Sequence, residues 1–283
     1  MASKDISMRS PFNNSSMRGF TILELLVVIS IIAILSSVVI VSSVEYRYRG
    51  ILARAYEFSA QFNRIYGAGL AGEWRFNEGS GTATADSSGN NLNGVLLNNA
   101  VWTSPSFDSS NAIVFGGTAN SAVVVADSPL LDVQRFAVSL WFKPTADITA
   151  ASGQKDILSK LDSYWIVINQ TISDGKIGVL LNNDPTTIRR TTTNVWKAGR
   201  WYHLAVTYDE GRISLYVNGL LETSDDIPGD PIPQNSTGAL GIGGDVWAGF
   251  PGTIDEVRIF NLDNSVVFET STSGATNIAR SEF

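Results

Sequence analysis

A single carboxylate interrupts an otherwise uncharged run near the amino terminus. Residues 20–44, FTILELLVVISIIAILSSVVIVSSV, carry only one charge, that of Glu24. An unpaired carboxylate near the end of a membrane helix is costly, so such a residue usually has a function and needs a partner. The alternative is a polar helix-end group that reaches for the interface. Just before the run, Arg18-Gly19-Phe20 joins a basic stretch to the apolar one through a small residue, which makes this junction the candidate for a cut in the chain.

The apolar run itself predicts a transmembrane helix. Leu25–Val44 contains twenty uncharged residues, which as a helix extend about 30 Å, the thickness of the hydrocarbon core of a bilayer. The basic leader, residues 1–19, should remain in the cytoplasm and direct the rest of the chain outside. A secretory signal peptide is not indicated, because the charged residues of segment 45–47 follow the run where a small-residue cleavage pattern would stand.

The helical pattern continues beyond the apolar run. Five apolar residues recur at spacings of four, three, four and three: Ile51, Ala55, Phe58, Phe62 and Ile65. The segment contains no proline, and Gly67 and Gly69 are expected to end it. We therefore predict one long helix from about Phe20 to Tyr66, within a transmembrane and assembly segment of residues 20–69. The apolar stripe of its outer half should lie against the remainder of the chain.

From Gly72 onward the hydrophobic period changes to two. Three alternating sets are clear: Phe136, Val138, Leu140 and Phe142; Tyr202, Leu204, Val206 and Tyr208; Ile213, Leu215 and Val217. The third set ends in Asn218-Gly219, a strong signal for a tight hairpin. No helical pattern of useful length interrupts the strands. This predicts an all-β antiparallel jelly-roll sandwich over residues 70–262, followed by a polar C-terminal tail, residues 263–283.

Charge and composition exclude several classes of function. Residues 1–69 have a net charge of +3 and the whole chain has −7, so residues 70–283 hold −10, the difference between the two. Nucleic-acid binding by this acidic head is disfavoured, because phosphates need a basic surface. The chain has no cysteine, which excludes disulfides, thiolate metal sites and thiol catalysis.

The segment RGFTILELLVVISIIAILSSVV, Arg18–Val39, resembles the processing and assembly segment of type IV pilins and pseudopilins. The resemblance covers roughly residues 15–66. It implies that a prepilin peptidase cuts between Gly19 and Phe20 and that the new amino terminus is methylated. It also implies that Glu24 pairs with the amine of a neighbouring subunit. The implied partners are other pilin subunits, the peptidase and an inner-membrane assembly platform. The proline and glycine frequent in the apolar half of major pilins are missing, so a major pilin, a minor pilin and a pseudopilin all remain open.

Residues 71–261 resemble laminin G-like, concanavalin A-like jelly-roll modules. Four blocks occur in the order of that family: GEWRFNEGSGTATADSSGNNLNG at 72–94, FAVSLWFKP at 136–144, WYHLAVTYDEGRISLYVNG at 201–219 and GTIDEVRIFN at 252–261. The resemblance implies a structural calcium ion that joins the opening loop to the last strand. Asp86 and Asp255 match the expected ligand positions and Asn93 offers a further oxygen, of the hard type that calcium prefers. The alternatives are a turn residue for Asp86 and a solvated strand residue for Asp255.

Trp247 is the candidate for ligand binding. It lies in the Gly-rich segment GGDVWAGFPG, where an aromatic ring is suited to stack on a sugar; the alternative is a loop anchor. An enzyme is disfavoured, because the Glu-x-Asp-x-x-Glu pattern of the related glucanases is missing. Asp255 and Glu256 are adjacent, which in a regular strand aims them at opposite faces.

Taken together, these features predict a type IV pilin-like filament subunit that displays its head for cell adhesion or carbohydrate binding. The precursor would lie in the cytoplasmic membrane with its head outside, and the assembled subunit in an extracellular pilus. The alternatives are a type II secretion pseudopilin with a purely structural head and, more distantly, a glycan-active enzyme.

Overall fold

The structure is a computed structural model that describes residues 20–108, 110–170, 172–245, 247–263, 268–270 and 276–278. The side chains of residues 37–44, 268–270 and 276–278 are outside this description. The chain divides into two compact units, residues 1–49 and residues 50–283. Helix α1, Ile22–Tyr66, begins in the first unit and ends in the second. The single long helix predicted from the sequence is thus confirmed, with its end immediately before Gly67.

Helix α1 is followed by a short 3₁₀ turn, η1 (Gly67–Gly69), and then by strands throughout. The side chains of Ile22 through Leu35 that the structure describes are exposed in the first unit. Among the described residues, no helix combines the length and the apolarity that a membrane crossing requires.

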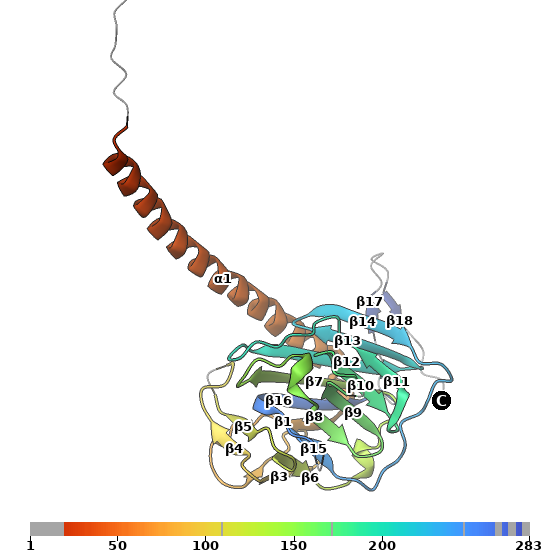
Figure 1. Cartoon of the computed structure of the whole chain (residues 1–283). Helices are drawn as coiled ribbons and strands as arrows, with labels where there is room; N and C mark the ends of the chain where they lie inside the picture. The colour runs from red at the N-terminus through yellow and green to blue at the C-terminus, as the bar shows by residue number, and fades with distance from the viewer. Residues whose placement is uncertain are drawn as a thin grey trace, which may run out of the picture. The chain divides into compact units, whose positions relative to one another are not determined.

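The second unit contains two antiparallel eight-stranded sheets (Figure 1). The order in sheet A is β14 (Leu220–Asp226), β13 (Arg212–Val217), β12 (Tyr202–Asp209), β7 (Phe136–Pro144), β16 (Pro251–Asn261), β5 (Ala112–Gly116) and β4 (Val101–Thr103), and β1 (Leu70–Trp74) also pairs with β16. The order in sheet B is β11 (Asp184–Arg190), β10 (Ile177–Leu181), β9 (Tyr164–Ile168), β8 (Lys155–Lys160), β15 (Leu240–Ile242), β6 (Ala122–Val125), β3 (Gly94–Leu97) and β2 (Ala83–Thr84).

Short elements complete the unit. Two further 3₁₀ turns are η2 (Pro129–Leu131) and η3 (Ala150–Ser152). Within the region predicted as a tail, β17 (Phe268–Thr270) pairs with β18 (Thr276–Ile278) to form a separate two-stranded sheet.

The inner faces of sheets A and B form one large core. All three alternating sets predicted from the sequence contribute to it, except that Tyr202 packs against the core from its edge. The predicted sandwich is therefore confirmed. The alternate residues of β7 are buried as well, among them Ser139 and Trp141, although alternation predicts that they face water. A second layer must therefore cover the outer face of sheet A.

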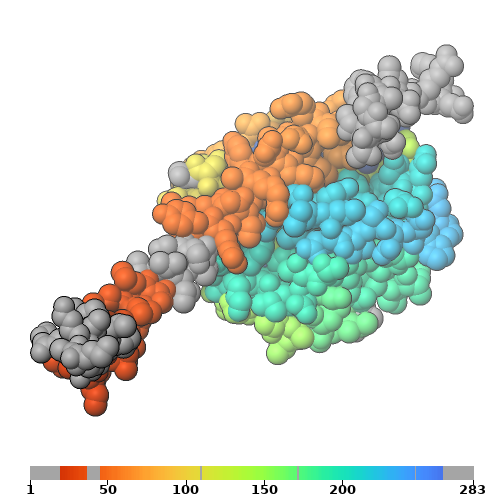
Figure 2. All heavy atoms as spheres, turned by 90° about the horizontal axis from the view of Figure 1, so that it is seen from above, coloured from red at the N-terminus to blue at the C-terminus, as the bar shows by residue number. Residues whose placement is uncertain are grey.

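That layer is the C-terminal half of α1. Ala55 packs with Trp141, and Phe62 packs with Ala137 and Phe260. Figure 2 shows this orange segment of α1 lying against the cyan segment of β13 and β14. The apolar stripe predicted from the sequence was partly wrong.

Two members of the predicted stripe face water: Ile51 is 38% exposed and Ile65 is 46% exposed. The covered stripe keeps Ala55, Phe58 and Phe62 of the predicted set and also includes Leu52, Ser59 and Tyr66. Ser59 was not predicted because the pattern was read from apolar residues alone. It is buried, and its small side chain lets the helix approach the sheet closely.

The predicted hairpin at Asn218-Gly219 is also confirmed. Both residues have positive φ, +51° and +74°, as a two-residue turn of this type requires. The turn touches the helix, since the Arg54 Nε donates a hydrogen bond of 2.9 Å to the Asn218 carbonyl. A Cβ added to Gly219 would lie 2.9 Å from the Cβ of Phe58. Glycine is therefore needed here both for its φ and for the close approach of the helix.

Candidate functional site

The amino-terminal candidates lie at the start of α1. Gly19 lies outside the described residues, and Phe20 is 82% exposed. Glu24 Oε2 accepts hydrogen bonds of 2.9 Å from both the backbone N–H and the hydroxyl of Thr21. The Glu24 N–H in turn donates to the Thr21 hydroxyl at 3.2 Å. This reciprocal pattern is a capping box, which satisfies donors that the first helical turn leaves free.

Glu24 therefore has a local role as well as the predicted intersubunit one. A glutamine supports a capping box as a glutamate does. Glu24→Gln consequently removes the charge and keeps the cap, whereas Thr21→Ala removes the cap and keeps the charge. The role of Glu24 in assembly stays a prediction, and these two variants separate it from the role in capping.

Asp86 organises the turn between β2 and β3. Its Oδ1 accepts from the N–H groups of Glu73 and Ser88, and its Oδ2 accepts from the Ser88 hydroxyl and the Leu92 N–H, at 2.8 to 3.0 Å. Partial burial by itself would raise the pKa of Asp86, but these hydrogen bonds outweigh it and lower the pKa. The Asn93 Oδ1 accepts from the Asp86 N–H at 2.9 Å. Both side chains thus point their oxygens at donors and not at an open position for a cation.

Asp255 lies on the outer face of sheet A, at a β-bulge of β16. The register shifts between Asp255 and Arg258, and Glu256 has a φ of +51°. Ile254 and Val257 both enter the core. Between them, Asp255 and Glu256 lie on the same outer side, where Glu256 bonds to Arg258. The expectation of opposite faces was wrong, because the bulge breaks the alternation.

The environment of Asp255 is buried and electrostatically unfavourable to an anion. Its Oδ1 accepts from the Glu256 N–H at 2.9 Å, while Oδ2 has no donor among the described residues. Burial, reinforced by the charges of Glu256 and Asp108, raises the pKa of Asp255 to about 8.

The predicted calcium ligands do not form a ready donor set. Asp86 and Asn93 are engaged by the turn, and no group of three or more His, Asp or Glu side chains in the described parts of the chain is arranged to hold a metal ion. Calcium binding stays a prediction from the family resemblance, and no step below relies on it.

Trp247 lies on the loop that joins β15 to β16, and its side chain is 68% exposed. The loop is held from within by Asp245. The Asp245 Oδ1 accepts from the Trp247 N–H at 2.6 Å and from the Ala248 N–H at 3.1 Å. The Asp245 N–H donates to the Ala248 carbonyl at 3.0 Å, and its carbonyl accepts from the Asn120 N–H at 2.6 Å. A large aromatic ring is thereby presented to water from a tightly bonded turn.

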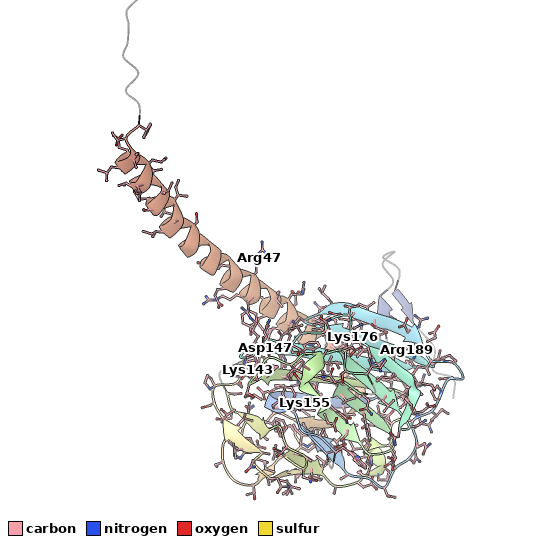
Figure 3. The ribbon with its side chains drawn as sticks, in the orientation of Figure 1. Arg47, Lys143, Asp147, Lys155, Lys176 and Arg189 are labelled. Carbon is pink, nitrogen blue, oxygen red and sulfur yellow. The ribbon has the colours of Figure 1, made fainter. Side chains whose placement is uncertain are left out.

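Trp247 borders a groove on the outward face of sheet B. The groove has a volume of about 280 Å³ and is lined by Gln154, Leu161, Asp162, Trp165, Gln170, Asn183 and Trp247, which we call the Trp247 groove. β8 begins at Lys155, labelled in Figure 3, directly after Gln154. Two buried polar atoms of the groove residues, Trp165 Nε1 and Gln170 Oε1, have no hydrogen-bond partner among the described residues. Such atoms are uncommon in folded proteins and mark unused hydrogen-bonding capacity.

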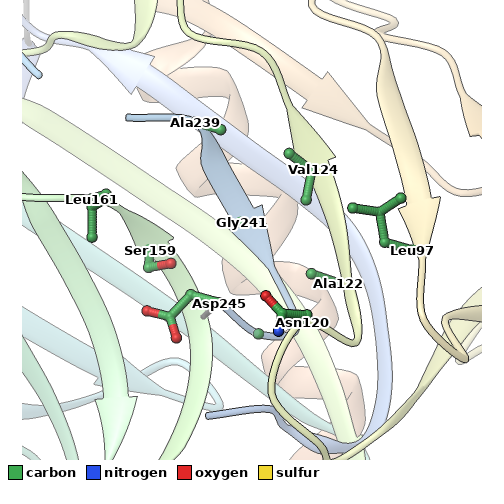
Figure 4. Close-up of a pocket in the computed structure, with 10 residues that line it drawn as sticks. Leu97, Asn120, Ala122, Val124, Ser159, Leu161, Ala239, Gly241 and Asp245 are labelled. Atoms are coloured by element: carbon green, nitrogen blue, oxygen red, sulfur yellow. The ribbon is translucent and has the colours of Figure 1, made fainter. Parts of the chain in front are cut away.

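A smaller pocket of about 170 Å³ adjoins the groove and shares Leu161 with it. Figure 4 shows Leu161 and Ser159 on one wall and Leu97 and Val124 on the opposite wall. Asp245 lines it as well, so the loop that carries Trp247 borders both hollows. Trp247, Trp165 and the amide side chains together form a mixed aromatic and polar surface.

Sequence reasoning named Trp247, which lines this groove, and did not name the other residues of the groove. Gln154, Gln170 and Asn183 come from separate turns, and only the pairing of β8, β9 and β10 brings them together. A signal existed for Trp165, because its neighbours Tyr164 and Ile166 enter the core and alternation turns Trp165 outward.

Comparisons with known families agree with this architecture. The family model of the concanavalin A-like lectin/glucanases superfamily matches residues 115–265, more than half of the chain. The chain therefore belongs to this superfamily. The prokaryotic N-terminal methylation motif matches residues 14–40, which confirms the type IV pilin-like resemblance of the amino-terminal segment. No curated protein matched the chain.

Among solved structures, similar folds occur in binding modules. Domain 4 of AbnA, an extracellular GH43 arabinanase from Geobacillus stearothermophilus, in complex with arabinotriose, has 24% identity and a TM-score of 0.53 over 68% of this chain and 92% of that domain. The binding domain of Paraclostridial Mosquitocidal Protein 1 has 15% identity and a TM-score of 0.53, over 69% of this chain and 49% of that one. The binding domain of botulinum neurotoxin serotype D has 17% identity and a TM-score of 0.50, over 68% and 48%. At these identities the likeness shows the jelly-roll fold alone.

Proposed function

We propose that this chain is a type IV pilin-like filament subunit whose head binds carbohydrate at the Trp247 groove. The amino-terminal part of the proposal is supported by the methylation motif at residues 14–40 and by the uncharged run that follows Glu24. The precursor is anchored in the cytoplasmic membrane by this run and is cut between Gly19 and Phe20 before it enters an extracellular filament.

The observation that carries the proposal for the head is the exposed Trp247 ring beside a groove of amide and carboxyl groups. An aromatic face stacks on the C–H face of a sugar, while amide and carboxylate groups of the kind supplied by Gln154, Gln170 and Asp162 bind its hydroxyls. The groove is smaller than the roughly 300–1,000 Å³ typical of drug-sized ligand pockets. That size suits one saccharide unit, at the end of a chain or along one bound across the open face.

An enzymatic role is not proposed. Of the adjacent carboxyl groups of β16, Asp255 is fully buried, and Glu256 lies beside α1, where it is held by Arg258. This leaves a binding module as the function that fits the open face of sheet B.

A glycan array probed with the full-length protein in detergent micelles tests the proposal for the head. We expect Trp247→Ala to weaken binding of the best array ligand by about tenfold or more, the loss of one stacked ring. Tyr56→Ala, which removes an exposed aromatic ring from α1, should leave binding and melting temperature unchanged. Binding that survives Trp247→Ala would place the site elsewhere, and an array without any bound glycan would favour the pseudopilin with a structural head.

The filament part is tested by chain length, membrane fraction and sheared surface filaments. Gly19→Val should leave a longer, membrane-bound precursor. Glu24→Gln should give a processed subunit that fails to enter filaments, because an amine and a carboxylate attract strongly in a low-dielectric environment. Thr21→Ala should still assemble. An amino-terminal sequence that begins beyond Val44 would contradict the cleavage site, and wild-type assembly of Glu24→Gln would contradict the charge pair.

A further inference from the structure

Two carboxyl groups far apart in the sequence meet beneath the loop that carries Trp247. Asp156 lies on β8 and is only 2% exposed, and its carboxyl group lies near enough to that of Asp245 for the two to interact electrostatically. The Oδ2 atoms of both residues are buried, and no other described residue supplies a donor to either of them. A proton carried by Asp156 would supply the donor that this contact otherwise does not have.

The surroundings favour a single shared proton. Two carboxylates in contact in a buried site cannot readily both ionise. Two neighbours lower the pKa of Asp156: Gln154 Nε2 donates to Asp156 Oδ1 at 2.9 Å, and the positive charge of Lys155 favours the ionised carboxylate. Burial, followed by the effect of Asp245, nevertheless raises the pKa of Asp156 to about 8.

The same Asp245 side chain fixes the Trp247 backbone. Its Oδ1 accepts the N–H groups of Trp247 and Ala248, and its buried Oδ2 has no donor among the described residues. Any force that displaces the Asp245 carboxyl group therefore acts on the residue that presents the Trp247 ring. The Asn120 N–H, bonded to the Asp245 carbonyl, holds the backbone on the other side.

We propose that a protonated Asp156 donates to Asp245 and that this positioning pair fixes Trp247, so that loss of the Asp156 proton releases the loop. Asp156 is thus a positioning residue for the ligand site. When both groups are ionised, their repulsion pushes Asp245 out from under the loop, and the hydrogen bonds to the Trp247 and Ala248 amides weaken. Only the consequence for sugar binding rests on the proposed function; the motion of the loop does not.

Hydrogen exchange of the peptide that contains Trp247 and Ala248 tests the inference without any ligand. The full-length protein in detergent micelles is measured below and above pH 8, with rates corrected for the intrinsic effect of pH. We expect protection of this peptide to fall by about tenfold as pH rises through the pKa of Asp156, because a local opening becomes easier. Constant protection across this range overturns the proposal.

Matched variants identify the pair as the cause. Asp156→Asn and Asp245→Asn each keep a polar group of the same shape and remove one ionisable group, so protection should no longer depend on pH in either. Asp225→Asn, an exposed carboxyl group on β14, should retain the wild-type dependence. A wild-type pH dependence in Asp156→Asn overturns the proposal. So does restoration of protection above pH 8 by calcium chloride, which would make the pair a cation site.

A parallel titration with arabinotriose, the sugar bound by the similar arabinanase domain, separates the two proposals. If protection changes with pH and no sugar binds, the positioning pair stands and the proposed function fails for this ligand class. If arabinotriose binds and protection is independent of pH, the function stands and the positioning pair is wrong. If both hold, affinity should fall together with protection above pH 8 and should be constant in Asp156→Asn.

Discussion

The outward faces of the two sheets of the head contrast in what they bury. On sheet A, Ser139 and His203 are fully buried beneath α1, and the Ser139 hydroxyl and His203 Nε2 share a hydrogen bond of 2.9 Å. On sheet B, the apolar Leu97 and the ring of Trp247 face water. The polar residues are thus covered and the apolar ones are open, the reverse of what residue type alone predicts. The element that packs on a sheet face decides which side chains of that face are buried. Buried polar side chains must then find hydrogen-bond partners there, as Ser139 and His203 do.

Each face also hides a carboxyl group whose pKa is raised. Asp255 is buried on sheet A beside Glu256 and Asp108, Asp156 is buried beneath the Trp247 loop, and burial is the main cause for both. The covering elements differ in extent, since α1 is a long helix and the loop is a short turn. We therefore expect the covered face of sheet A to control global stability and the open face of sheet B to control local motion.

The largest effect should follow from removal of the main contact between α1 and sheet A. Phe62 is buried against Tyr66 and Phe260, with ring centroids 4.7 and 6.2 Å away. We expect Phe62→Ala to lower the free energy of unfolding by about 3–5 kcal/mol, measured by urea denaturation. Ile65 lies about one helical turn after Phe62 and is exposed. Ile65→Ala should therefore change the free energy of unfolding by less than about 0.5 kcal/mol. Equal effects would mean that the helix does not cover the sheet in solution.

Acid should act on the covered face through His203. Burial, with a smaller contribution from Arg258, lowers the pKa of His203 from 6.5 to about 3. The folded state therefore binds this proton less readily than the unfolded state does. The stability that His203 supports is complete above pH 6.5 and is lost as pH falls toward 3, by at most about 1.4 kcal/mol per pH unit.

The chain has one histidine, so a single variant isolates this effect. Urea unfolding of the wild type and of His203→Gln is compared across the acid range. The free energy of unfolding of the wild type, relative to that of His203→Gln, should fall as pH falls from 6.5 to 3. A flat difference would show that His203 reaches water and that the cover on sheet A is loose.

A smaller effect should separate contact with the helix from backbone strain. Gly219 and Gly229 both have positive φ, +74° and +85°, so alanine at either costs about 1–3 kcal/mol. Only Gly219 also approaches Phe58, whereas a Cβ at Gly229 meets nothing within 4 Å. We expect Gly219→Ala to be more destabilising than Gly229→Ala by about 1 kcal/mol or more in urea denaturation. Equal losses would indicate that the hairpin does not touch α1.

Chelation should have the smallest effect. Four donors already bond to the oxygens of Asp86, one of the three residues that the family resemblance assigns to calcium. We therefore expect little change in the melting temperature of the full-length protein when EDTA is added, with elemental analysis of the untreated protein as the control. A clear fall, together with bound calcium, would restore the predicted site and require ligands other than Asp86.

Sequence patterns predicted the parts of this structure that depend on near neighbours. Alternation placed the core residues of β7, β12 and β13, and Asn218-Gly219 marked its hairpin. Regular alternation failed at Asp255 and Glu256, because a bulge depends on the partner strands and leaves no reliable mark in the sequence. The helical pattern also failed in part, because Leu52 packs against the sheet while Ile51 faces water.

What the sequence determined by itself is therefore local. The uncharged run, the capping pair of Thr21 and Glu24, and the strand periods follow from spacing along the chain, because they involve residues within a few positions of one another. The Trp247 groove and the contact between Asp156 and Asp245 were decided only by the tertiary structure. Distant segments meet there. Burial raises the pKa of Asp156, while the loop above it leaves Trp247 exposed to water. Energies of this kind depend on the surroundings of a residue, which its type and its neighbours in the sequence do not specify.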